Sequence, residues 1–170
     1  MSIKKKKMEL RSIGIIHSPF KKPDGMPIQP VFANGAEGTV EVLPEFAAGL
    51  KDLQGFERIW LLYWFDRTSE TKLIVKPFRD SSERGLFSTR APCRPNPIGM
   101  SAVRLLRIVN NSLYVADIDV LDGTPLLDIK PYVSEFDCFE DSRCGWMQNL
   151  RHKTTPADSR FYRKEENQGD

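Results

Sequence analysis

Short segments with the composition of β-strands recur along most of the chain, and they constrain its fold more than any other feature. Residues 12–18 (SIGIIHS) and 38–44 (GTVEVLP) are rich in β-branched residues, and a proline closes each run. Residues 59–65 (IWLLYWF) are apolar without alternation, which is typical of a strand buried on both faces. Two further runs, 72–77 (KLIVKP) and 84–89 (RGLFST), predict short strands on either side of a polar loop.

A hairpin is predicted across Asn110-Asn111. The segments on either side, 101–109 and 112–120, both have a strand pattern, and asparagine tolerates the positive φ that tight hairpin turns require. In the second segment, strict alternation predicts that Asp117 and Asp119 face away from an apolar set made up of Tyr114, Ala116, Ile118 and Val120.

One short helix is predicted at residues 44–56, where apolar residues recur at helical spacing behind Pro44. Many short strands with one or two short helices indicate a mainly β protein, whose single sheet closes or nearly closes into a small barrel. We assign this barrel to residues 11–133, after a flexible basic arm at 1–10. Residues 134–170 contain scattered aromatic residues without a sustained period, which predicts an irregular C-terminal extension.

Charge and cysteine content exclude several classes of function. The formal net charge of the 170 residues is +2 and falls to −2 without the four lysines at 4–7, so bulk charge does not indicate a nucleic-acid-binding protein. Three cysteines without a C-x-x-C pair, together with two histidines, indicate neither a disulfide framework nor a metal site. Without a long apolar run or a visible signal peptide, we expect a cytoplasmic protein that does not bind membranes.

The stretch FSTRAPCRPNPIG, residues 87–99, is the strongest candidate for a ligand-binding loop. Each of its three prolines fixes φ and pushes the preceding residue toward extended backbone, so the segment is stiff and a poor strand. Arg90 and Arg94 offer planar hydrogen-bond donors, and Asn96 offers both a donor and an acceptor. These groups suit a polar, nucleotide-like ligand. The alternative is a stiff connector whose arginines pair with nearby carboxylates.

A second group of polar residues lies in DIDVLDGTPLLDIKPY, residues 117–132. The DGTP tetrapeptide at 122–125 has a turn signature, and in extended backbone Asp128, Lys130 and Tyr132 share one face. A carboxylate in this segment suits contact with ribose hydroxyls, balance of a sulfonium charge or removal of a proton. The alternative is that the turn aspartate only caps the turn, and that Asp128 and Lys130 form an exposed ion pair.

The two motifs in this order, FSTRAPCRPNPIGMS and then DVLDGTPLLDIKPY, strongly resemble the TsaA/TrmO family. The segments GIIHSPF, GLKDLQGFERIWLLYWFDRT and KPFRD add to the resemblance, which covers roughly residues 13–132. It implies a small single-sheet barrel that binds S-adenosylmethionine without a Rossmann fold. It also implies methylation of N6 of threonylcarbamoyladenosine, next to the anticodon of certain tRNAs. In agreement, no G-x-G-x-G loop follows any predicted strand.

The resemblance implies site residues position by position. The residues that match the surroundings of the cofactor are Gln29, Pro30, Val31, Asp66, Arg67, Arg90, Met100, Asp117, Ile118 and Asp119. Those that match the motif lining the same cleft, for the substrate, are Arg94, Asn96, Thr124 and Lys130. Because a nitrogen that carries a carbonyl substituent is a weak nucleophile, a carboxylate or a tyrosine should remove or orient its proton. We assign this catalytic role to Asp122, with Tyr132 second.

Bacterial members of the family carry His-Gln where this chain has Asp66-Arg67, and they have an extra C-terminal domain, so the chain is more similar to the short archaeal form. The resemblance also implies that the protein forms a homodimer and that it binds the tRNA anticodon loop. The apolar residues of the extension then cover either their own barrel or the partner subunit; they are Phe136, Phe139, Trp146, Met147, Phe161 and Tyr162. Two other functions stay open: a non-catalytic S-adenosylmethionine sensor or adaptor, and a methyltransferase for a substrate other than RNA.

Overall fold

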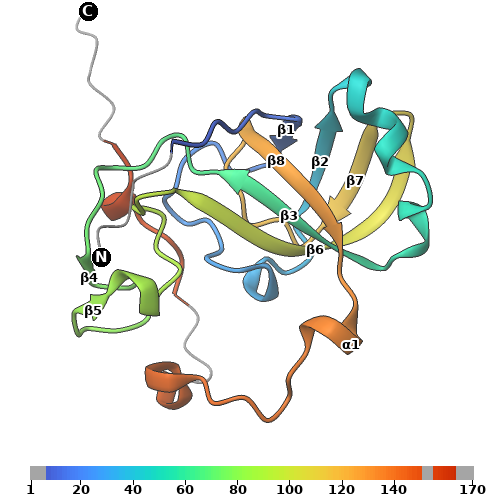
Figure 1. Ribbon diagram of the computed structural model, residues 1–170. Helices are drawn as coiled ribbons and strands as arrows, with labels where there is room; N and C mark the ends of the chain where they lie inside the picture. The colour runs from blue at the N-terminus through green and yellow to red at the C-terminus, as the bar shows by residue number, and fades with distance from the viewer. Residues whose placement is uncertain (1–6, 151–154, 164–170) are drawn as a thin grey trace, which may run out of the picture.

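Six strands close into one antiparallel barrel in the computed structural model, which describes residues 7–150 and 155–163 (Figure 1). Around the barrel the strands follow the order β1–β2–β7–β6–β3–β8, and β8 pairs with β1 to close it. Their bounds are β1 Gly14–His17, β2 Glu37–Val42, β3 Arg58–Trp64, β6 Ile98–Val109, β7 Ser112–Ala116 and β8 Thr124–Pro131. The prediction of a mainly β, single-sheet barrel is confirmed.

The main hydrophobic core fills the interior of the barrel. Ile16 of β1 and Val103 of β6 are fully buried there. The prediction that β3 is buried on both faces was wrong, because its burial alternates: Leu61 and Tyr63 are buried, whereas Trp64 is 49% exposed. A sheet that closes on itself has one inner face, so the outer side chains of β3 stay accessible and are free to line a site.

The predicted hairpin between β6 and β7 is confirmed, and its turn residue Asn110 has a φ of 55°. The predicted set of inward residues was right for Ala116, which is buried, but wrong for Tyr114, which lies half-buried beneath Arg107. Leu113 and Val115 are fully buried in its place. The strand ends at Ala116, and Asp117 adopts left-handed backbone with a φ of 65°. This kink shifts the alternation, after which the chain returns to the core through Ile118 and Val120.

The single helix predicted at residues 44–56 is replaced by two 3₁₀ helices, Pro44–Leu50 and Leu53–Gly55. Asp52 lies between them in left-handed backbone, with a φ of 65°, and this conformation interrupts a regular helix. The apolar spacing in the sequence still has a structural cause, because Phe46 and Leu50 pack against the core from one end of the segment.

A small second sheet lies beside the barrel and consists of β4, Ile74–Val75, and β5, Arg84–Gly85 (Figure 1). Both strands are shorter than predicted, and a 3₁₀ helix, Leu86–Ser88, follows β5 directly. Beneath this sheet, Val75, Leu86, Cys93 and Phe161 form a second buried cluster. The cluster fixes the proline-rich stretch, which contains Cys93, to the C-terminal segment, which contains Phe161.

The C-terminal segment begins with helix α1, Ser134–Asp137, and then runs beneath the barrel toward β4 and β5 (Figure 1). It contains two 3₁₀ helices, Gly145–Leu150 and Ser159–Phe161. Residues 155–163 pair with their own chain: the N–H of Ala157 donates to the carbonyl of Met26 at 2.9 Å. Within the described residues, no helix has the length and apolar character that crossing a membrane requires. Of the predicted basic arm, residues 1–6 lie outside the described residues.

Candidate functional site

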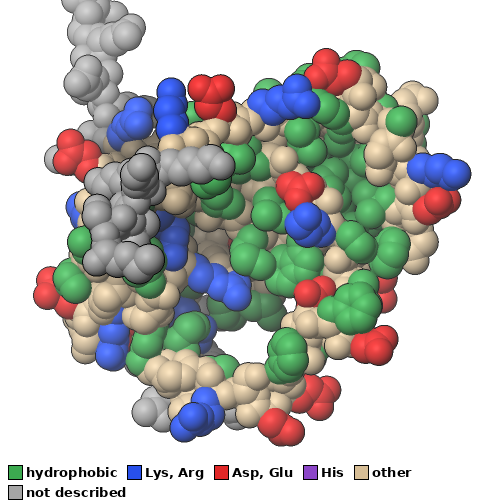
Figure 2. Space-filling view, in the orientation of Figure 1, with side chains coloured by type: hydrophobic (Ala, Val, Ile, Leu, Met, Phe, Trp, Pro, Cys, Tyr) green, Lys and Arg blue, Asp and Glu red, His purple; other side chains and the backbone are tan. Residues whose placement is uncertain are grey.

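A cleft of about 1140 Å³ lies against the outer face of β3 and β6 and reaches buried side chains at one end of the barrel. Trp60 and Met100 form part of its barrel wall, and the 3₁₀ helix Pro30–Phe32 contributes another part. The proline-rich stretch and Trp146 of the C-terminal segment complete the lining. Figure 2 shows this face of the molecule hollowed between the barrel and the segment that runs beneath it.

The proline-rich stretch borders the cleft, and its two arginines have different hydrogen-bond partners. Arg90 is exposed, and its guanidinium donates to Oε1 of Gln29, so two segments that were assigned to the cofactor meet here. Arg94 donates instead to backbone carbonyls of its own loop, those of Thr89 at 3.0 Å and Ala91 at 3.4 Å. Its guanidinium also lies over the ring of Phe87. Arg94 therefore holds the curvature of the loop that presents Arg90.

A buried carboxyl group, Asp119, lies where the cleft meets the end of the barrel. Its side chain is 6% exposed, and the hydroxyl of Ser101 donates to its Oδ1 at 2.5 Å. The hydroxyl of Tyr63 lies 3.0 Å from Ser101 Oγ, which extends the hydrogen-bonded chain. Burial raises the pKa of Asp119 to about 7, although the Ser101 hydrogen bond works in the opposite direction. The group therefore changes charge near neutral pH.

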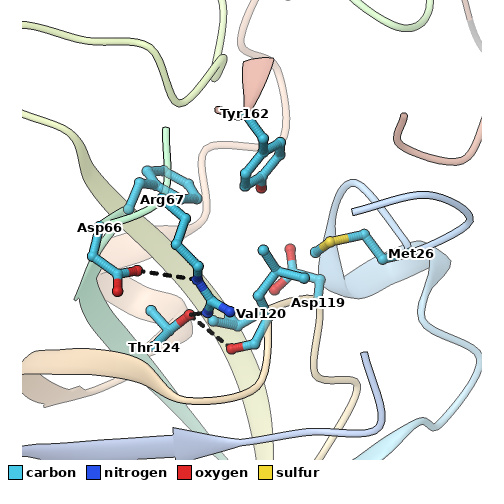
Figure 3. A pocket seen from close by; sticks show the side chains of 9 residues that line it. Met26, Asp66, Arg67, Asp119, Val120, Thr124 and Tyr162 are labelled. Atoms are coloured by element: carbon cyan, nitrogen blue, oxygen red, sulfur yellow. Dashed lines mark hydrogen bonds and ion pairs between the residues drawn. The ribbon is translucent and has the colours of Figure 1, made fainter. Parts of the chain in front are cut away.

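Beside Asp119 a small cavity of about 10 Å³, the size of roughly one water molecule, separates the barrel from Tyr162 (Figure 3). Arg67 spans one side of it, donating to the carbonyl of Asp122 at 2.7 Å and to the hydroxyl of Thr124 at 3.1 Å. Its Nε also lies 3.4 Å from the carboxylate of Asp66. Three residues assigned to cofactor or substrate, Asp66, Arg67 and Thr124, thus line this cavity rather than the cleft.

The other predicted carboxylate of this strand end, Asp117, lines the cleft but is paired. The guanidinium of Arg58 lies 3.0 Å from its Oδ2, and that of Arg104 lies 3.9 Å away. Beside this pair, the rings of Trp60 and Tyr132 contact each other with centroids 5.7 Å apart. This end of the cleft therefore combines aromatic surface with a neutralised ion pair.

Asp122, the predicted general base, is not among the residues that line the cleft. Its Oδ1 accepts the backbone N–H of Ser18 at 3.0 Å, and its Oδ2 lies 2.6 Å from Nζ of Lys21. The hydrogen bond from Lys21 lowers the pKa of Asp122, so the carboxylate is a weak base. The geometry within one chain is that of a turn cap, which was the alternative interpretation, and the catalytic role of Asp122 stays a prediction.

Three further assignments lie away from the cleft. The side chain of Ile118 is fully buried in the core, so the chain offers a ligand only the backbone at this position. Lys130 forms the alternative ion pair with Asp128, with 2.8 Å between Nζ and Oδ2. Asn96 is exposed in the loop and is absent from the cleft lining. By contrast, the cleft lining includes nine of the assigned residues: Gln29, Pro30, Val31, Arg90, Arg94, Met100, Asp117, Asp119 and Tyr132.

Sequence reasoning missed several residues of the site. Arg58 and Trp60 lie on the outer face of β3, whereas that apolar run was predicted to be buried on both faces. Alternate positions of a strand in a closed barrel were the signal that could have found them. Tyr162 reaches the cleft only because the C-terminal segment folds back, and no local sequence pattern indicates such a contact.

The cleft combines properties that select its ligand. Apolar and aromatic side chains cover much of its wall, whereas Arg90 offers an exposed guanidinium. Asp119 has no cationic side chain within 4.0 Å among the described residues, so its negative charge is not neutralised by a salt bridge. The arrangement suits a ligand of nucleotide-like size with polar groups, apolar parts and a positive charge.

The chain is similar in sequence and in structure to known proteins. A probable S-adenosyl-L-methionine-binding protein of Pyrococcus abyssi is 54% identical over 154 residues, which are 89% of this chain and 84% of that protein. The tRNA (adenine(37)-N6)-methyltransferase of Escherichia coli is 33% identical over 151 residues, covering 83% of this chain and 64% of that enzyme. The crystal structure of TrmO from Pseudomonas aeruginosa matches with a TM-score of 0.71 and 38% identity, over 84% of this chain and 62% of that one.

The chain thus spans somewhat less than two thirds of the length of the E. coli enzyme and of the solved P. aeruginosa protein. The family model of the tRNA-methyltransferase O N-terminal domain matches residues 15–138, which include all of the barrel strands except Gly14 of β1, together with most of the residues that line the cleft. The chain therefore belongs to the family of the tRNA-methyltransferase O N-terminal domain.

Proposed function

We propose that the protein is an S-adenosylmethionine-dependent methyltransferase that modifies N6 of adenosine in tRNA. Its substrate in this proposal is threonylcarbamoyladenosine next to the anticodon. Relatives named for S-adenosylmethionine binding support the cofactor, and the E. coli relative named for adenine 37 supports the reaction. One observation carries the proposal: a single cleft brings together Gln29, Arg90 and the buried Asp119, which lie far apart in the sequence.

The residues of the cleft fit this cofactor. Adenosine needs an apolar slot with a few polar contacts, and the exposed side chains of Val31 and Phe87 offer apolar surface on two sides of the cleft. Arg90, held by Gln29, is placed to donate to a carboxylate or to a ribose oxygen. Asp119, which forms no salt bridge with any described residue, suits the positive charge of a sulfonium.

The chemistry follows from what the cofactor supplies and what the chain supplies. When bound, the cofactor provides an activated methyl group on a positively charged sulfur. The chain orients the acceptor nitrogen, and alignment at close distance lowers the barrier of such a transfer by several kcal/mol. The aromatic pair Trp60 and Tyr132 offers a surface on which a nucleobase can stack. Tyr132 also offers the hydroxyl that was assigned to orient the N6 proton, as the second candidate after Asp122.

We further propose that the protein works as a homodimer. Phe136 and Phe139 are 68% and 73% exposed, although they lie on a segment that is attached to the barrel. The attachment is a hydrogen bond from Nε1 of Trp60 to Asp137 at 3.2 Å. Aromatic side chains held in this way suit burial against a second copy of the chain. Phe161 and Tyr162, by contrast, pack on their own chain.

The test is methyl transfer to purified tRNA that carries or lacks the threonylcarbamoyl group, followed by mass spectrometry of the nucleosides. We expect one added methyl group on the modified adenosine and none on unmodified adenosine. Methylation of both tRNAs contradicts the proposed substrate but not the reaction. Binding of S-adenosylmethionine without methylation of either tRNA favours the sensor or adaptor, or a substrate other than RNA. Loss of the methylated nucleoside from a deletion strain is the matching test in cells.

A further inference from the structure

Asp119 differs from Asp117 and Asp122 in that no cationic side chain among residues 7–150 and 155–163 is paired with it. Asp117 is paired with Arg58 at 3.0 Å, and Asp122 with Lys21 at 2.6 Å. Among the described residues, no lysine, arginine or histidine nitrogen lies within 4.0 Å of Asp119, although the residue is only 6% exposed. A carboxyl group in this position lacks the charge compensation that buried carboxylates normally have.

The polar groups nearest to Asp119 are hydroxyl groups, and charged groups lie farther away. Tyr63 of β3 and Ser101 of β6 form its hydrogen-bonded chain, and burial raises the pKa of Tyr63 well above its usual value, so the phenol is neutral. Tyr162 faces it from the C-terminal segment, with a pKa raised to about 12 by burial. The charged groups lie farther away: Arg90, across the cleft, lowers the pKa of Asp119, and Arg67 and Asp66 line the small cavity beside it.

We propose that Asp119 makes the cleft select a cationic ligand over its neutral counterpart, because a positive charge in the cleft favours the ionised form of this buried carboxyl group. This inference rests on the proposed cofactor. A sulfonium bound in the cleft is a cation, whereas the product left after methyl transfer is a neutral thioether of nearly the same shape. The same cleft then holds the cofactor through a charge that its product lacks.

The hydrogen-bonded chain gives this selectivity a mechanism. With the carboxylate ionised, Tyr63 donates to Ser101, and Ser101 donates to Asp119. Near neutral pH, burial favours the neutral carboxyl group in the free protein, since its pKa is about 7. A nearby cation lowers that pKa, so the cation displaces the proton as it binds. The neutral thioether does not lower the pKa, and the proton stays.

Isothermal titration calorimetry with S-adenosylmethionine and S-adenosylhomocysteine tests this, because measurements in two buffers of different ionisation enthalpy count the protons released. At pH 6.5 we expect most of one proton to be released with S-adenosylmethionine and much less with S-adenosylhomocysteine. Below pH 7 the affinity for S-adenosylmethionine should fall by about tenfold per pH unit, relative to that for S-adenosylhomocysteine. Above pH 7 the ratio of the two affinities should be constant.

Three variants make the result specific. Asp119→Asn should abolish the difference in proton release and reduce the preference for the cation at pH 8. Ser101→Ala removes the hydrogen bond that favours the ionised form, so the pH at which the preference is lost should rise. Asp128→Asn changes a half-exposed carboxylate that is paired with Lys130, outside the cleft, and should behave as the wild type.

The outcomes separate this inference from the proposed function. If neither compound binds, the cofactor assignment is wrong. If both bind, and proton release is equal for the two or unchanged in Asp119→Asn, the cofactor stands and the role of Asp119 is refuted. If Asp119→Asn does not fold, the shift of the pH threshold in Ser101→Ala decides, and an unshifted threshold counts against the proposal.

Discussion

The ring of Tyr63 packs directly on the backbone of Gly99, its partner across the β3–β6 pair. A Cβ atom at position 99 would lie 2.2 Å from Cε2 of Tyr63, which no side chain tolerates without movement. We expect Gly99→Ala to lower the free energy of unfolding by about 1–3 kcal/mol, because overpacking of a buried ring forces it from its position. Chemical denaturation measures this change.

Gly49→Ala is the matched control for that substitution, because nothing lies within 4 Å of a Cβ atom at this exposed position. Its stability should stay within about 0.5 kcal/mol of the wild type. Equal stability of the two variants would show that Tyr63 moves aside without cost, and that the Tyr63–Gly99 contact does not fix the end of the barrel.

Arg90→Ala should weaken binding of S-adenosylmethionine by tenfold or more. The guanidinium is held beside Gln29 at the edge of the cleft, and a charge-assisted hydrogen bond to a bound ligand contributes about 1.5–3 kcal/mol. Arg107→Ala is the control, since Arg107 lies over Tyr114 on the outer face of the barrel and away from the cleft. Calorimetry that finds equal affinity in both variants refutes the assignment of Arg90.

Arg94→Ala should act through stability and only secondarily through substrate. Nη1 of Arg94 donates to the carbonyl of Thr89 at 3.0 Å, and its loss leaves the loop without this internal support. We expect a loss of about 1–3 kcal/mol in the free energy of unfolding. Arg94→Lys should not restore it, because an ammonium group cannot reproduce the planar fork. A variant of normal stability with weaker tRNA binding supports the substrate role instead.

The contrast between β7 and its turn shows what the sequence could predict. The turn at Asn110 depends on the residues of the turn itself, and the sequence therefore predicted it correctly. The left-handed backbone of Asp117 occurs where its carboxylate pairs with Arg58, a residue 59 positions away, and it was missed. Strict alternation was therefore applied across a kink, and Tyr114 was placed inward where Leu113 and Val115 are the buried residues.

The site shows the same division between local and distant causes. The stiffness of the proline-rich stretch follows from its own residues, and the stretch does border the cleft. The direction of Arg94 toward the carbonyls of its own loop and the pairing of Asp122 with Lys21 are set by folding, so their assignment to substrate or catalysis went beyond what pattern shows. Tyr162 reaches the cleft through chain reversal, which no periodicity indicates.

Asp119→Asn should raise the free energy of unfolding at high pH, and this gain should be smaller at low pH. The pKa of Asp119 is about 7 in the folded state and about 3.9 in unfolded chains, so the folded state binds the extra proton between these values. The contribution of Asp119 to the free energy of unfolding of the wild type is therefore fully present below pH 4, and it is lost as the pH rises toward 7. The gain in the variant should grow by roughly 2–3 kcal/mol between pH 5 and pH 8.

Denaturant titrations of both proteins at the two pH values give this difference directly. The Asn side chain keeps an acceptor for the hydroxyl of Ser101, so packing should change little. An equal difference at pH 5 and pH 8 would mean that Asp119 ionises in the folded state as it does in water, and the selectivity argued from its proton would then lose its basis.

The exposed aromatic residues of the α1 region predict the state of assembly. Light scattering at micromolar concentration should give the mass of a dimer, and Phe136→Ser with Phe139→Ser should shift it toward that of one chain. The reason is that these rings are 68% and 73% exposed while Asp137, one residue after Phe136, is hydrogen-bonded to Trp60, so the segment offers an ordered apolar surface. Val109→Ser, at an exposed apolar position of the β6–β7 hairpin, should leave the mass unchanged. A single-chain mass for the wild type, together with full methyl transfer, shows that one copy suffices.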